Sequence, residues 1–146
     1  MAGEINVIIH PVGEAQSAVV ATGSVVAGDW VYAYQTSTDD LFAAARGDAY
    51  TAGSVFVARL AVGANDGYVV GIALNNAGSN ETVSVATEGT FIGISAVTPT
   101  AGKAVMTTGQ GLADYNNDAS GAGYIVGRAL TGASAASKYL LFKLSV

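Results

Sequence analysis

Few side chains in this sequence can act as a nucleophile, a base or a metal ligand. The chain has no cysteine, and His10 is its single histidine. A Ser-His-Asp arrangement would need His10 as the base, together with a carboxylate that orients the imidazole. His10 stands beside Pro11 at the end of an apolar stretch that offers no such carboxylate. We therefore expect a surface or subunit-contact histidine, and we expect that the protein is not an enzyme.

A pair of neighbouring carboxylates, Asp39 and Asp40, is the next candidate for acid–base chemistry. Adjacent residues in a loop usually point apart, so they do not form the facing pair that glycoside hydrolysis requires. Following Thr38, they favour a turn or a helix N-cap in front of Leu41. We expect a local structural role for both aspartates.

A polar loop that begins at Asp114 has the spacing of a calcium site. Oxygen-bearing side chains recur at every second position, through Asn116 and Asp118, as they do in calcium-binding loops. However, Ala119 stands where an EF-hand loop has its glycine, and Ile125 stands where it has a bidentate glutamate. An Asx-rich hairpin loop explains the same residues, because Asn and Asp tolerate left-handed turns. We expect no metal and no cofactor, and Asp114, Asn116 and Asp118 are the candidate ligands if a metal binds.

Composition and charge exclude several classes of function. The chain has 146 residues, a formal net charge of −5 and only six Lys or Arg residues, which are scattered singly. Nucleic-acid binding needs a basic stripe that such a chain cannot form. No apolar run reaches the roughly 18 residues of a membrane span. The first residues lack the basic-then-apolar layout of a secretory signal, so we expect a protein made in the cytoplasm.

The overall composition favours short strands. Hydrophobic residues make up 51% of the chain and charged residues 12%, and there are 19 glycines. A chain rich in Gly and Val with few charges is poor material for surface helices but suits short strands joined by tight turns.

Two segments of the chain repeat. Residues 67–74 (GYVVGIAL) return at 123–130 (GYIVGRAL) with an offset of 123 − 67 = 56. Upstream, residues 27–32 (AGDWVY) match 101–106 (AGKAVM) with an offset of 101 − 27 = 74. The difference, 74 − 56 = 18 residues, predicts an insertion in the first copy, placed at residues 39–53 around the helix-like stretch LFAAAR.

The matched segments predict two units with the same order of strands. After each Gly-Tyr strand, a polar turn leads into a closing strand, at residues 81–86 in the first copy and 138–144 in the second. We place the first repeat at about residues 24–96 and the second at about 97–146. The resulting β-domain covers residues 24–146.

The strands alternate with the two-residue period of half-buried sheet. In the last strand Leu140, Phe142 and Leu144 share one face. Gly71 and Gly127 stand at equivalent places inside strands and predict bends or bulges where a small sheet curls. The expected fold is all-β, a small antiparallel β-barrel or sandwich made of two pseudo-repeats.

The first 23 residues stand apart from the repeat. They contain an apolar stretch, INVIIH, that ends at Pro11. Such a segment can be an edge strand of its own domain or an arm that reaches a neighbouring molecule by strand addition. Both interpretations of residues 1–23 remain open at this stage.

The repeated pattern resembles the capsid decoration (cement) proteins of tailed phages and related archaeal viruses. The resembling residues are 27–32, 71–74, 83–89, 101–102 and 127–130. The resemblance implies a homotrimer that binds the major capsid protein on the outer surface of the mature icosahedral shell, after residence in the host cytoplasm during assembly. No nucleic-acid or membrane partner is expected. An alternative of the same structural class is a tail, fibre-base or receptor-binding β module of a virion.

In that family the N-terminal arm commonly attaches the protein to the capsid. The resemblance therefore implies capsid contacts in the apolar N-terminal stretch. The candidate residues are Ile5, Val7, Ile8, Ile9, His10 and Pro11.

Overall fold

The computed structural model describes residues 7–10, 15–34, 55–61, 69–115 and 125–146. The described residues form thirteen strands: β1 (Val7–His10), β2 (Ala15–Val20), β3 (Ser24–Val25), β4 (Trp30–Ala33), β5 (Phe56–Arg59), β6 (Val69–Ala73), β7 (Ala77–Gly78), β8 (Thr82–Ala86), β9 (Glu88–Ile94), β10 (Ala104–Thr108), β11 (Gly111–Asp114), β12 (Ile125–Ala129) and β13 (Tyr139–Ser145). No helix within these residues is long and apolar enough to cross a membrane. The predicted all-β class is confirmed.

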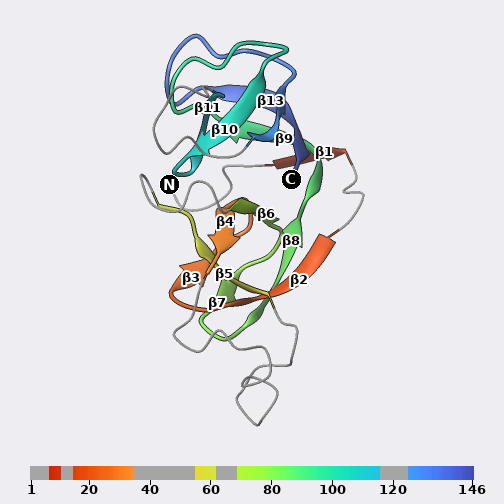
Figure 1. Ribbon diagram of the computed structural model, residues 1–146, viewed down its shortest axis with the longest axis vertical. Coiled ribbons are helices and arrows are strands. Elements are labelled where there is room, and N and C mark those ends of the chain that lie inside the picture. The colour runs from red at the N-terminus through yellow and green to blue at the C-terminus, as the bar shows by residue number, and fades with distance from the viewer. Residues whose placement is uncertain (1–6, 11–14, 35–54, 62–68, 116–124) are drawn as a thin grey trace.

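The first unit is a closed barrel in the order β2-β5-β4-β6-β8. The β2–β5 pair is parallel and the other pairs are antiparallel. The short ribbon β3-β7 accompanies the barrel, which occupies the lower half of the view in Figure 1. Small and β-branched side chains from the barrel strands and the ribbon form one buried cluster: Ala18, Val20, Val25, Val31, Val57, Ala73, Ala77, Val83 and Val85.

The second unit repeats this arrangement strand for strand. Strands β9, β13, β12, β10 and β11 are neighbours in the same order as β2, β8, β6, β4 and β5. A parallel bridge between Ser95 and Leu112 stands where the parallel β2–β5 pair closes the first unit. Strand β1 joins the outer edge of β9, which completes a six-stranded sheet in the upper half of Figure 1. The prediction of two pseudo-repeats is confirmed.

The registers of the two units agree residue by residue. Val31 pairs with Gly71 in the first unit, and Val105 pairs with Gly127 in the second. The register shifts directly after each of these pairs, as at a β-bulge. The equivalent residues are separated by 105 − 31 = 74 and 127 − 71 = 56 positions, which are the two offsets found in the sequence.

Each unit begins one strand earlier than the sequence matches suggest. β2 lies within residues 1–23, yet it is a strand of the closed barrel. β9 lies within the range assigned to the first repeat, yet it pairs with β13 of the second unit. These opening strands share no sequence motif, AQSAVV against EGTFIGI, so residue matching alone does not reveal their equivalence.

The predicted insertion falls between two strands. β4 and β5 are separated by residues 34–55, whereas their counterparts β10 and β11 are joined by a two-residue turn. The helix-like stretch at residues 41–46 lies outside the described residues.

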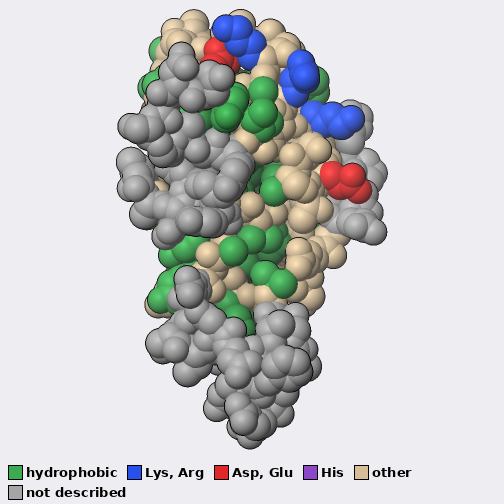
Figure 2. Space-filling view, viewed as in Figure 1, with side chains coloured by type: hydrophobic (Ala, Val, Ile, Leu, Met, Phe, Trp, Pro, Cys, Tyr) green, Lys and Arg blue, Asp and Glu red, His purple; other side chains and the backbone are tan. Residues whose placement is uncertain are grey.

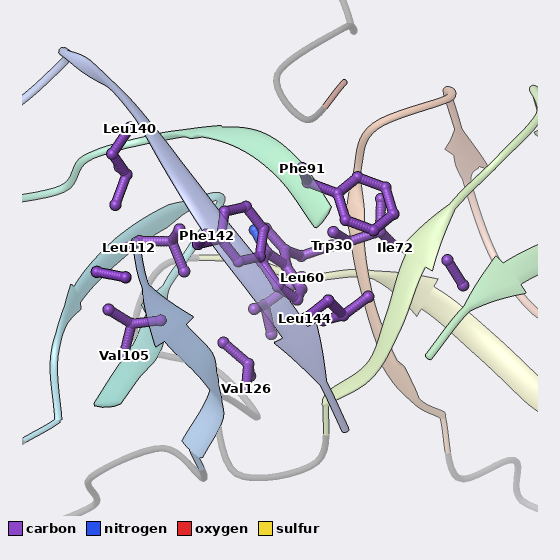
Figure 3. Close-up of a cluster of buried hydrophobic side chains, with 12 residues drawn as sticks. Trp30, Leu60, Ile72, Phe91, Val105, Leu112, Val126, Leu140, Phe142 and Leu144 are labelled. Atoms are coloured by element: carbon purple, nitrogen blue, oxygen red, sulfur yellow. The ribbon is translucent and has the colours of Figure 1, made fainter. Parts of the chain in front are cut away.

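A shared core joins the two units. Trp30 from β4 is fully buried beside Phe142 of β13, with the ring centroids 5.8 Å apart, and Phe142 also stacks on Phe91 at 6.0 Å. Figure 3 shows Leu60 and Ile72 of the first unit in the same cluster. β4 is therefore buried on both faces where it begins, because Trp30 belongs to the shared core while its neighbour Val31 belongs to the cluster inside the barrel.

Candidate interaction surface

β1 is an edge strand of the second unit. Its backbone pairs antiparallel with β9, through Val7 opposite Ile92 and Ile8 opposite Phe91. The register then shifts, so that His10 lies opposite Thr90. Of the two interpretations of the N-terminal segment, the edge strand describes residues 7–10.

The structure brings the candidate contact residues Val7, Ile8, Ile9 and His10 together on β1. Ile5 and Pro11 lie outside the described residues. A capsid contact through this segment remains a prediction.

Asp114, the first residue of the suggested calcium loop, is engaged with a turn. Its Oδ1 accepts a hydrogen bond from the Thr100 N–H at 2.8 Å, and its Oδ2 accepts one from the Thr100 hydroxyl at 2.8 Å. The Lys103 ammonium lies 3.8 Å from Oδ2. Asn116 and Asp118, like Asp39 and Asp40, lie outside the described residues, which hold no cluster of three metal-ligating His, Asp or Glu side chains.

The ion pair between Asp114 and Lys103 has a counterpart in the first unit, in which the acidic and the basic residue have exchanged positions. There Asp29 accepts from the Arg59 side chain at 3.0 Å and from the Val26 N–H at 3.1 Å. Asp29 is equivalent to Lys103, and Arg59 is equivalent to Asp114, by the registers of β4–β5 and β10–β11. In both units a carboxylate accepts a hydrogen bond from the turn that precedes the strand, which is β4 in the first unit and β10 in the second. The carboxylate is that of Asp29, directly before β4, in the first unit and that of Asp114, on the neighbouring strand β11, in the second. This shared hydrogen bond accounts for the position of Asp114.

The turn between β10 and β11 connects the two units, a role that the sequence did not reveal. The Gln110 side chain accepts from the Trp30 N–H at 2.7 Å and donates to the carbonyl oxygens of Trp30 at 3.0 Å and Leu60 at 2.8 Å. Gly109 has a φ of 58°, which a two-residue hairpin turn requires at its first position. In the sequence, the segment GQG indicates only a tight turn, because its partners lie 50 and 80 positions away.

The second unit carries the large exposed hydrophobic side chains of the described residues and most of the basic residues of the chain. Every large hydrophobic side chain that is exposed among the described residues belongs to it: Val97, Tyr115, Ile125, Leu130, Tyr139 and Val146. Residues 88–146 contain four Lys or Arg and three Asp or Glu, a net charge of +1, whereas residues 1–87 contain two and eight, a net charge of −6. The basic side chains in view in Figure 2 gather at the end formed by the second unit. This unit is therefore the candidate interaction surface.

The fold and this surface define an all-β protein of two units, one of which is a closed barrel, and comparisons with known proteins add one likeness of structure. No family model and no curated protein matches the chain. Among solved structures, the N base of the head fiber protein gp8.5 of bacteriophage phi29 is similar to it, with a TM-score of 0.54 and 12% sequence identity. The match covers 90% of this chain and 93% of that one. At this identity the likeness shows a common fold.

Proposed function

We propose that the chain is a structural protein of a phage virion that binds the outside of the mature head and stabilises it. The observation that carries the proposal is the fold shared with a head fiber base over nearly the whole of both chains. Two units joined by a shared core suit such a role, because they can hold neighbouring subunits at fixed positions. The partner would be the major capsid protein, and the assembly would be a homotrimer.

Binding can stabilise a shell without any covalent chemistry. A ligand that binds only the expanded state of a shell stabilises that state by mass action. Many copies on one lattice add their contributions. The net charge of −5 on each chain would keep free trimers apart before they attach.

A second candidate function is the base of a head fibre. It is favoured by the similar structure, which is the base of a head fiber protein. Electron microscopy of particles made with and without the gene separates the two. A decoration protein would add density over the shell surface, whereas a fibre base would carry projecting fibres that disappear with the gene.

Co-sedimentation tests the decoration function. We expect the wild-type protein to pellet with expanded shells and to remain in solution with procapsids. Deletion of residues 1–12 would weaken binding by about tenfold, because β1 would no longer be available for main-chain pairing. Sedimentation equilibrium of the free protein would give three times the chain mass of 14.5 kDa.

Two controls accompany this test. The thermal transition of the deletion variant is recorded, because β1 also pairs with β9 and its loss lowers stability. Equal binding to both shell forms, or to neither, would contradict the decoration function.

A further inference from the structure

The two units carry equivalent faces in different surroundings. In the first unit the residues of this face either belong to the shared core or pack against it. Trp30, Leu60, Ile72 and Ala86 belong to the core, and Val69 and Leu74 pack against it. The strand registers and matching backbone hydrogen bonds identify the equivalent residues in the second unit as Ala104, Tyr115, Ile125, Arg128, Leu130 and Lys143. We call this second set the end face. None of its six residues is buried, and Tyr115, Ile125 and Leu130 are 39%, 49% and 46% exposed. The face with which the first unit packs against the second unit is thus exposed to solvent at the equivalent place in the second unit.

The end face carries two cations that no carboxylate among the described residues neutralises. Arg128 and Lys143 lie directly opposite each other on β12 and β13. Like charges at such positions destabilise a sheet. The ion pairs among the described residues give neither of them a carboxylate partner within 4 Å, and Arg128 donates only to the Gly102 carbonyl oxygen, at 2.7 Å. The equivalent pair in the first unit is Ile72 and Ala86, which the second unit covers.

The chemistry of the end face specifies its partner. Carboxylates would form charge-assisted hydrogen bonds with Arg128 and Lys143, and apolar side chains would cover Tyr115, Ile125 and Leu130. We propose that the end face docks onto an acidic, partly apolar protein surface of the virion shell. This inference rests on the proposed function and names the surface that performs it.

Two other occupants fit the observations less well. A second copy would have to present both carboxylates and apolar side chains to the end face, yet its acidic first unit has no large exposed hydrophobic side chain among the described residues. Nucleic acid would supply anionic groups to Arg128 and Lys143, but it would leave the apolar side chains of the end face uncovered.

Charge reversal at a single lysine tests the inference, with a matched control in the same segment of the chain. Lys143→Glu alters the end face, whereas Lys138→Glu makes the same change just before β13, about 17 Å away along an extended strand. Binding to expanded shells that lack this protein is measured at about 50 and 300 mM NaCl. We expect Lys143→Glu, and likewise Arg128→Glu, to raise the Kd by about tenfold at low salt, and Lys138→Glu to change it by less than about twofold. The higher salt concentration should weaken the wild type more than Lys143→Glu.

Each outcome decides between the inference and the proposed function. Unchanged binding by Lys143→Glu and Arg128→Glu would overturn the inference and leave the proposed function intact. Failure of the wild type to bind shells would overturn both. A change in the sedimentation mass of the free protein on charge reversal would overturn the inference by showing that a second copy covers the end face. The neutral variant Lys143→Gln, with its melting temperature recorded, separates lost binding from lost folding.

Discussion

Two glycines at equivalent positions show how a single residue shapes both units. A Cβ atom on Gly71 would lie 2.0 Å from the Ala86 carbonyl oxygen, and one on Gly127 would lie 2.0 Å from that of Lys143. Each glycine therefore lets a neighbouring strand approach more closely than any side chain would permit. The sequence predicted a bend at both positions, and the register shift beside each glycine confirms it.

We expect Gly71→Ala and Gly127→Ala each to lower the free energy of unfolding by about 3 kcal/mol, because the added methyl group meets backbone and not a movable side chain. Gly78→Ala is the matched control, since its Cβ would meet the Glu81 carboxylate at an ordinary 3.4 Å. Urea unfolding followed by circular dichroism measures the difference. A loss for Gly71→Ala no larger than for Gly78→Ala would contradict the close approach.

A second pair of equivalent residues shares an unusual backbone conformation, which the sequence predicts for only one of the two. Asn80 and Ser137 both have a positive φ, 67° and 60°, and their N–H groups donate to the carbonyl oxygens of Val20 and Ser95. Asparagine tolerates the left-handed region, so a turn at Asn80 is readable from the sequence. Ser137 carries no such signal. It adopts the same conformation because the strands on either side impose it.

At the scale of elements, the connections between strands differ more than the strands themselves. The turn between β10 and β11 is short, and its tip places Gln110 against Trp30 and Leu60 of the first unit. The corresponding connection in the first unit spans residues 34–55. The hairpin turn with Gln110 therefore links the two units by hydrogen bonds, and we call this turn the clasp. The connection at the same place in the first unit is longer.

Replacing the clasp tests its contribution to stability. Gln110→Leu should destabilise the protein by about 2 kcal/mol, because the Trp30 N–H and the Leu60 carbonyl oxygen lose the partner that Gln110 supplies. Gln16→Leu, at an exposed position on β2, is the control and should change stability by less than about 0.5 kcal/mol. Thermal and urea unfolding report both variants. Equal effects would show that the three hydrogen bonds contribute nothing net.

At the scale of the whole molecule, the shared core joins the closed barrel of the first unit to the six-stranded sheet of the second. The first unit fills its own interior with small β-branched side chains and presents larger ones, led by Trp30, to the second unit. The interior of the second unit, with Phe91 and Phe142, is completed by these residues. Each unit thus depends on the other for part of its buried surface, and we expect them to unfold in one cooperative transition.

Trp30→Ala should remove about 3–5 kcal/mol of stability, because a fully buried indole is replaced by a cavity in the shared core. Tyr139→Ala is the control, as this tyrosine is 61% exposed and its loss should cost less than about 1 kcal/mol. Urea unfolding monitored by Trp fluorescence and by circular dichroism shows whether the wild type has one transition. Two separate wild-type transitions would contradict a shared core.

The sequence alone determined the features that depend on near neighbours in the chain. The alternation of Leu140, Phe142 and Leu144 with exposed residues follows from the two-residue period of a strand, and the observed burial confirms it. The repeated glycines and the two offsets revealed the duplication, because equivalent backbone constraints keep equivalent residues. These local signals were sufficient for the all-β class and the two-unit plan.

Only the tertiary structure decided how the two units meet and which face of each remains open. Trp30 and Ala104 occupy equivalent positions, yet one is buried and the other is partly exposed, since burial depends on what packs on the strand from 80 or more positions away. The same reason hid the clasp at Gln110, the edge strand β1 on β9, and the end face with Arg128 and Lys143. His10 and its apolar neighbours were visible as a separate segment, but their place beside β9 required the fold.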